Sequence, residues 1–145
     1  MKNIPPDFIT EEVTFRCNIG VMALVAFMMR NYIVDLIEQT ASAEDFKMPP
    51  HFMLEVVRIN NEMISFVNNF DFKKEKGEVA KVTIQCVPRA MAAYGILLDN
   101  NLENIWMIFE SMKIPILPNG KKEIIKFIRQ MRDCLGVSFD WRSAN

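Results

Sequence analysis

The chain has 145 residues, of which 50% are hydrophobic and 24% are charged, and its formal net charge is −1. So much apolar surface excludes an intrinsically disordered chain, and the length predicts a single domain over residues 1–145. The small net charge excludes a global field that would attract nucleic acid or an anionic membrane.

The N-terminal part of the chain predicts an arm followed by a long helix. Residues 1–10 contain two adjacent prolines and predict an extended arm. Thr10 is a suitable N-cap, so we expect a helix over residues 11–39. Its middle, Ile19–Met29, is apolar on every side, and a helix of that kind must be enclosed by others. We therefore expect this segment to be the central helix of the fold.

A second helix is predicted to start near His51, after a loop over residues 40–50. Large apolar residues recur along it at helical spacing: Phe52, Val56, Ile59, Met63, Phe66 and Phe70. Asn60 falls within this apolar sector, where a buried amide needs hydrogen-bond partners. It is either a satisfied core amide or a contact point for a second chain, and we retain it as a partner-binding candidate.

The segment Val79–Val87 is ambiguous. Its β-branched residues favour a strand by type, but Pro88 follows and no second convincing strand is evident elsewhere. Because a lone strand cannot satisfy its own backbone hydrogen bonds, we favour a helix or extended packing here. The choice between strand and helix stays open.

The remaining periodicity predicts three more helices, over residues 89–99, 102–112 and 121–135, with prolines and an Asn-Gly pair separating the last two. The expected fold class is therefore all-α. We expect a single-domain helical bundle of five to seven helices around the central apolar helix.

The C-terminal tail, residues 137–145, alternates apolar and polar side chains, which predicts an extended segment with one apolar face. Phe139 and Trp141 are costly to leave in water. They either fold back on their own domain or dock on another chain. We take both as partner-binding candidates.

Basic side chains form a strip on the last predicted helix. Residues 115–145 carry 6 Lys and Arg against 3 Asp and Glu. Lys122, Lys126 and Arg129 recur at i, i+4 and i+7, and Arg132 flanks them. This strip is either an ordinary solvated face or a surface that meets phosphates or an acidic protein. It lacks interleaved aromatic residues, so it predicts no sequence-specific reading of nucleic acid.

Catalytic and metal-binding patterns are not evident. The chain has one histidine, His51, and its cysteines, Cys17, Cys86 and Cys134, lack the close spacing of structural zinc sites. No glycine-rich phosphate loop occurs. We expect no enzyme activity, no cofactor and no metal.

The unpaired thiols and the lack of a secretory signal predict a cytoplasmic or otherwise intracellular protein, and the uncharged stretch Cys17–Met29 is too short to span a bilayer.

These observations favour a non-catalytic protein-interaction or self-assembly module. Its partner, another protein or a second copy, would meet exposed Met and aromatic surfaces and the two terminal arms. The alternative is a nucleoprotein or coat-type protein that binds RNA without reading its sequence, through the basic last helix. An enzyme of unknown type is the third possibility.

Overall fold

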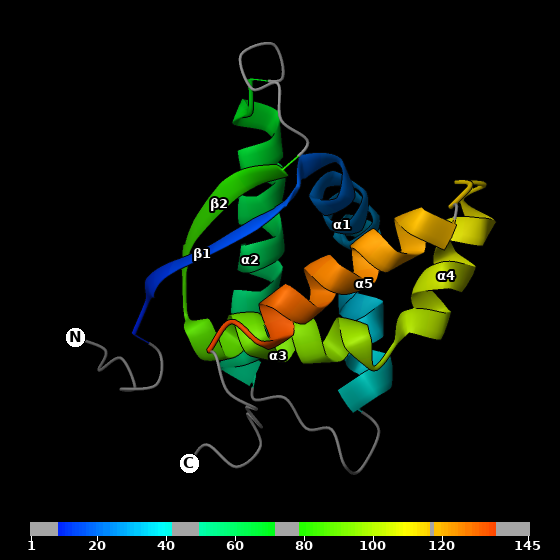
Figure 1. The fold of residues 1–145 in the computed structure, drawn as a ribbon. Coiled ribbons are helices and arrows are strands. Elements are labelled where there is room, and N and C mark those ends of the chain that lie inside the picture. Colours follow the sequence, from blue (N-terminus) through cyan, green and yellow to red (C-terminus); the bar gives the residue numbers. More distant parts are fainter. Residues whose placement is uncertain (1–8, 42–49, 72–78, 117, 136–145) are drawn as a thin grey trace.

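The computed structural model describes residues 9–41, 50–71, 79–116 and 118–135, and there it combines helices with a small sheet. The elements in chain order are β1 (Glu11–Asn18), α1 (Ile19–Ala41), α2 (Pro50–Asn69), β2 (Val79–Cys86), α3 (Pro88–Asp99), α4 (Leu102–Ser111) and α5 (Pro118–Arg132) (Figure 1). The expectation of an all-α fold is therefore wrong, because two segments that contribute to the core are strands.

β1 and β2 form an antiparallel ribbon that pairs Glu11 with Cys86 at one end and Asn18 with Val79 at the other. Alternate side chains point into the core, as the period of a strand requires. The inward set is Val13, Phe15, Cys17, Val82, Ile84 and Cys86. The ribbon thus closes one side of the helical core with a single apolar face.

The predicted helix over residues 11–39 is wrong in its first eight residues, which form β1. The open choice between strand and helix over Val79–Val87 is decided for a strand, since Val79–Cys86 is β2, so a helix there is wrong. Thr10, expected as a helix cap, instead accepts a hydrogen bond at its hydroxyl from the side-chain amide of Gln85, at 3.1 Å. Within the described residues each strand has only the other as a sheet partner, and the two are far apart in sequence: Thr14 and Thr83 are 69 residues apart.

α3, rather than α1, is the most enclosed helix. Eight of its twelve residues are buried: Ala90, Met91, Ala92, Ala93, Tyr94, Gly95, Leu97 and Leu98. It packs closely against α5 on one side and contacts α2 on another. Small side chains let these neighbours approach the α3 backbone, which explains how so short a helix buries most of its residues at the lower end of the molecule (Figure 1).

α1 packs along α2, and α5 crosses it (Figure 1). One face of α1 remains open, with Leu24, Phe27 and Val34 exposed. The prediction that Ile19–Met29 is enclosed on every side is therefore wrong for this face. By length and composition, the stretch Ile19–Glu38 is long and apolar enough to cross a membrane, and 44% of its most apolar window is buried in the fold.

A buried polar contact joins three of the helices. The side-chain amide of Asn60, in α2, donates to the carbonyl oxygen of Ala26 in α1 at 3.0 Å. The hydroxyl of Tyr94, in α3, donates to the Asn60 side-chain oxygen at 2.6 Å. Asn60 is 1% exposed, so the structure places it in the core as a hydrogen-bonded amide.

Glu55 provides a second buried polar contact, at the corner between β2 and α3. Its carboxylate accepts from the backbone amide of Val87 at 2.8 Å and from the guanidinium of Arg58 at 2.6 and 2.9 Å. Arg58 also donates to the carbonyl oxygen of Gln85 at 2.7 Å. Glu55 is 5% exposed, because β2 and the start of α3 cover it.

Candidate functional site

A hollow of about 840 Å³ lies between the ribbon and the last helix. β1 contributes Thr14 and the edge of Phe15, and α5 contributes Lys122, Lys126 and Arg129. The three basic residues project to the same side because they occur at helical spacing, while the opposite face of α5 is buried against the core. The predicted basic strip therefore lines a concave surface rather than a convex one.

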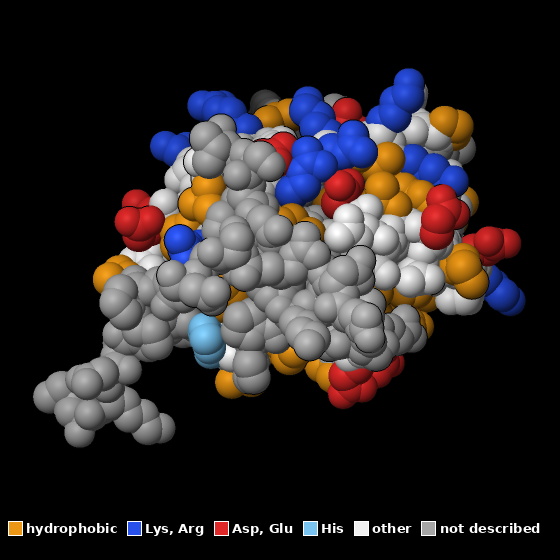
Figure 2. Space-filling view, turned by 90° about the horizontal axis from the view of Figure 1, so that it is seen from below, with side chains coloured by type: hydrophobic (Ala, Val, Ile, Leu, Met, Phe, Trp, Pro, Cys, Tyr) orange, Lys and Arg blue, Asp and Glu red, His pale blue; other side chains and the backbone are white. Residues whose placement is uncertain are grey.

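A second, smaller hollow of about 320 Å³ adjoins the first, because Lys126 and Gln130 line both. It adds Arg16 from β1 and Glu123 from α5. We call the two hollows together the basic groove, with Arg16, Lys122, Lys126 and Arg129 as its cations. Figure 2 shows Lys and Arg side chains gathered along one edge of the molecule, with acidic side chains interspersed.

The outer face of the ribbon continues the positive charge beyond the groove. Arg16 pairs in register with Lys81, so two cations stand directly opposite each other on adjacent strands, and both are exposed. Like charges in that position destabilise a strand pair. Glu62 and Asp71 line the same hollow as these two cations, so acidic side chains lie near them. The next outward pair, Thr14 and Thr83, joins its hydroxyl oxygens at 3.0 Å and offers neutral hydrogen-bonding groups.

Acidic side chains already engage two members of the predicted basic strip. Arg132 Nη1 lies 2.9 Å from Asp99 Oδ2, and Arg129 Nε lies 3.3 Å from Asp99 Oδ1. Arg132 also contacts Asp133 at 2.9 Å. The hydrogen bonds that Arg132 donates to Asp133 and Asp99 raise the pKa of Arg132, and the same contact lowers the pKa of Asp133. These pairs hold the last turn of α5 against the end of α3.

The sequence-predicted strip therefore divides into two parts. Within the described ranges, Lys122 and Lys126 form no ion pair and face the basic groove. Arg129 lines the groove while bonded to Asp99, and Arg132 serves the contact between α3 and α5.

Two cations of this surface, Arg16 and Lys81, were missed because the ribbon that positions them was not predicted. The alternation of Val13, Phe15 and Cys17 with polar residues was the signal that could have found them.

Of the partner-binding candidates, Asn60 lies in the core, whereas Phe139 and Trp141 fall outside the part of the chain that the structure describes.

The histidine and the cysteines do not form a reactive group. His51 is exposed, and its ring lies 5.1 Å from that of Phe52. Burial raises the pKa of Cys17 and of Cys86 to about 12 and that of Cys134 to about 11. These thiols stay protonated near neutral pH and are poor nucleophiles. Across the described residues, no group of three or more His, Cys, Asp or Glu residues could hold a metal ion.

Burial of the thiols makes the stability of the protein sensitive to alkali. The pKa of Cys17 and of Cys86 rises from 9.0 to about 12 on folding, so the unfolded chain loses these protons first. Their contribution to the free energy of unfolding is complete below pH 9 and is lost as the pH rises toward 12. We expect urea midpoints to fall progressively above pH 9. The fall should be shallower in Cys86→Ala, and a pH-independent midpoint over that window would contradict the prediction.

Comparisons of this chain with protein-family models, with curated proteins and with solved structures found no match. Its function therefore has to be inferred from the geometry of the fold and of the basic groove.

Proposed function

We propose that this protein is a non-catalytic binding module that holds the phosphate backbone of single-stranded RNA in the basic groove. The observation that carries the proposal is the convergence of Arg16, from β1, with Lys122 and Lys126, from α5, on adjoining hollows. Arg16 and Lys122 lie more than a hundred positions apart in the sequence. Only the fold gathers these charges on one concave surface.

The chemistry of the groove favours phosphate over base recognition. Lysines bind phosphate as flexible point charges, and the hydroxyl of Thr14, which lines the same hollow, adds a neutral hydrogen-bonding group next to them. The aromatic residues of the groove, Phe15 and Phe127, are 7% and 1% exposed, and their ring centres lie 5.8 Å apart, so neither ring offers a stacking platform. Binding is therefore expected to be independent of sequence.

Local rather than global charge would drive the attraction, since the net charge of the chain is −1. Screening limits the reach of each cation to about 10 Å at 0.1 M salt. A strand that lies in the basic groove stays within that distance of Lys122, Lys126 and Arg16, whereas one that approaches another face does not. Affinity should therefore be strong only at low ionic strength.

The proposal predicts a specific loss in the double variant Lys122→Gln/Lys126→Gln. Its affinity for a fluorescein-labelled oligouridylate, measured by fluorescence anisotropy, should fall by roughly tenfold at low salt, because two phosphate contacts are removed. A plot of log affinity against log salt should become shallower by about 1.4, since each contact with a single strand contributes about 0.7 to the slope.

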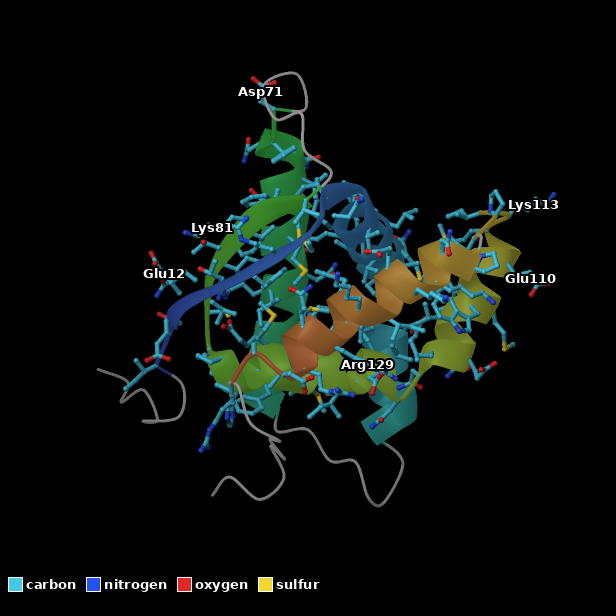
Figure 3. All side chains as sticks on the ribbon, in the orientation of Figure 1. Glu12, Asp71, Lys81, Glu110, Lys113 and Arg129 are labelled. Carbon is cyan, nitrogen blue, oxygen red and sulfur yellow. The ribbon has the colours of Figure 1, made fainter. Side chains whose placement is uncertain are left out.

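The matched control is Lys113→Gln/Lys121→Gln, which removes the same charge elsewhere. Lys113 lies beyond the end of α4, on the opposite side of the molecule from Lys81 (Figure 3), and the ammonium of Lys121 lies 5.2 Å from the ring centre of Trp106. This control should keep the affinity and the slope of the intact protein. An equal loss of RNA affinity in the two double variants would refute the proposal. So would a lack of RNA binding by the intact protein at low salt.

A second function, self-assembly, is favoured by a separate observation, the exposed apolar face of α1. It does not involve the basic groove, so the two functions are compatible.

A further inference from the structure

The exposed face of α1 carries apolar side chains at a spacing that serves helix pairing. Leu24, Phe27 and Val34 are 36%, 37% and 53% exposed, and Asn31, also exposed, lies between the last two. We call these four residues the α1 seam. Their spacings of three, four and three residues are those of the a and d positions of a coiled coil. The α1 seam therefore has the pattern of a contact surface, and the described residues of its own chain leave it exposed.

Charges flank the α1 seam in a self-complementary way. Arg30 precedes Asn31, and Asp35 follows Val34, and both are exposed. In a parallel helix pair, the residue just before an a position of one helix lies opposite a residue of the other helix. That opposite residue is the one that comes just after the next d position. Arg30 would therefore face Asp35 of a second copy, and the symmetry of the pair would repeat the contact. An antiparallel pair would instead bring like charges together.

We propose that α1 pairs in parallel with α1 of a second copy of this chain through the α1 seam, which makes a symmetric dimer. A second copy can form these ion pairs, because each chain carries both Arg30 and Asp35. Asn31 would face Asn31 of the second copy. A single asparagine at an a position favours this register and a two-stranded pair.

The surface beside the α1 seam fits the same partner. A hollow of about 390 Å³ lies between α1 and α4, next to Asp35, and is lined by Tyr32, Leu36 and Met107. Met107 is 64% exposed. Its unbranched side chain adapts to neighbours of different shape, so it can cover the flank of an approaching helix. The apolar contact thus extends beyond the helix itself.

Charge reversal tests the parallel arrangement directly. Sedimentation equilibrium of the full chain should show a monomer–dimer equilibrium. Arg30→Glu and Asp35→Arg should each raise the dimer dissociation constant by roughly tenfold, because each places like charges opposite one another at two symmetric positions. The double variant Arg30→Glu/Asp35→Arg should return to within about threefold of the intact chain, since the opposite charges are restored.

The apolar part of the contact has its own test. Val34→Glu should leave the chain monomeric, whereas Leu54→Glu, at a 75% exposed position on α2, should keep the dimer. Far-UV circular dichroism checks that both variants are folded. A monomeric intact chain, or a double reversal no better than the single ones, would overturn the proposal. So would a monomer that sediments with phosphatidylcholine vesicles and loses this binding in Val34→Glu, because the α1 seam would then face a membrane.

Discussion

Replacing Gly95 with alanine should lower the free energy of unfolding by about 3 kcal/mol or more, or prevent folding altogether. Gly95 lies in α3 where α5 crosses it most closely. A Cβ atom at this position would lie 2.5 Å from the Cα of Arg132 and 2.7 Å from the carbonyl carbon of Met131. Both are backbone atoms, which cannot rotate away as a flexible side chain would.

The added methyl group can be accommodated only if α3 and α5 move apart. That movement would open gaps around the buried side chains of Tyr94 and Leu98 and stretch the contacts from Arg129 and Arg132 to Asp99. The loss of packing and of ion pairing would therefore add to the direct clash. For this reason the expected effect exceeds that of an ordinary surface substitution.

Urea unfolding followed by circular dichroism measures the effect, and Gly120→Ala is the matched control. A Cβ atom at Gly120, in the first turn of α5, would have its nearest neighbour, a methyl group of Ile116, at 3.4 Å. Alanine there should be neutral or stabilise by up to about 1 kcal/mol, since it favours the helix over glycine. A Gly95→Ala variant as stable as Gly120→Ala would show that the two helices do not meet as described.

The second large effect is expected at Glu55, where alanine should cost about 3 kcal/mol. The buried carboxylate accepts from the Val87 amide and twice from Arg58. Its removal leaves the Val87 amide without its acceptor in a buried position and leaves Arg58 without its main counter-charge. Because the Val87 amide lies at the start of α3, the junction between β2 and α3 should loosen first.

Glu62→Ala is the control for this prediction, since it shortens the same residue type on the same helix beside the same arginine. Its carboxylate lies 3.8 Å from Arg58 and is 52% exposed. Exposed pairs of this kind contribute little, so the free energy of unfolding should change by less than about 0.5 kcal/mol. Equal losses in the two variants, measured by urea unfolding, would mean that burial of Glu55 does not matter.

Periodicity predicted four of the five helices well. α2 was expected from His51 and begins at Pro50, and α3 and α4 differ from expectation by a single residue at one end. α5 begins at Pro118 rather than Lys121, because proline is well suited to the first position of a helix and needs no amide hydrogen bond there. These elements are local: each depends on spacing, turn residues and caps that lie within its own segment.

The strands could not be predicted in the same way. The pattern of Val13, Phe15 and Cys17 is short and leads directly into the apolar α1, so the local sequence predicts the start of a helix there. The segment Val79–Val87 is not predicted as a strand, because the sequence shows no convincing partner strand for it. The two errors are connected, because a strand is stable only beside another strand, and without one strand the other lacks a partner. The two segments also lie far apart in sequence, on either side of α1 and α2.

The candidate site shows the same division. Lys122, Lys126 and Arg129 were identified by their spacing on a helix, which places them on one face whatever the fold. The sequence could not reveal that Asp99 already binds Arg129, or that Arg16 and Lys81 extend the charge. Those facts depend on the contact between α3 and α5 and on the register of the ribbon.

The sequence by itself determined the helical segments, the lack of a recognisable catalytic motif and the basic face of the last helix, because these depend on residue type and on local spacing. Only the tertiary structure decided that α3 is the most buried helix, that α1 keeps an open face and that the basic residues line a groove. Burial and strand pairing arise between segments that are distant along the chain, and no local pattern specifies which distant segments meet.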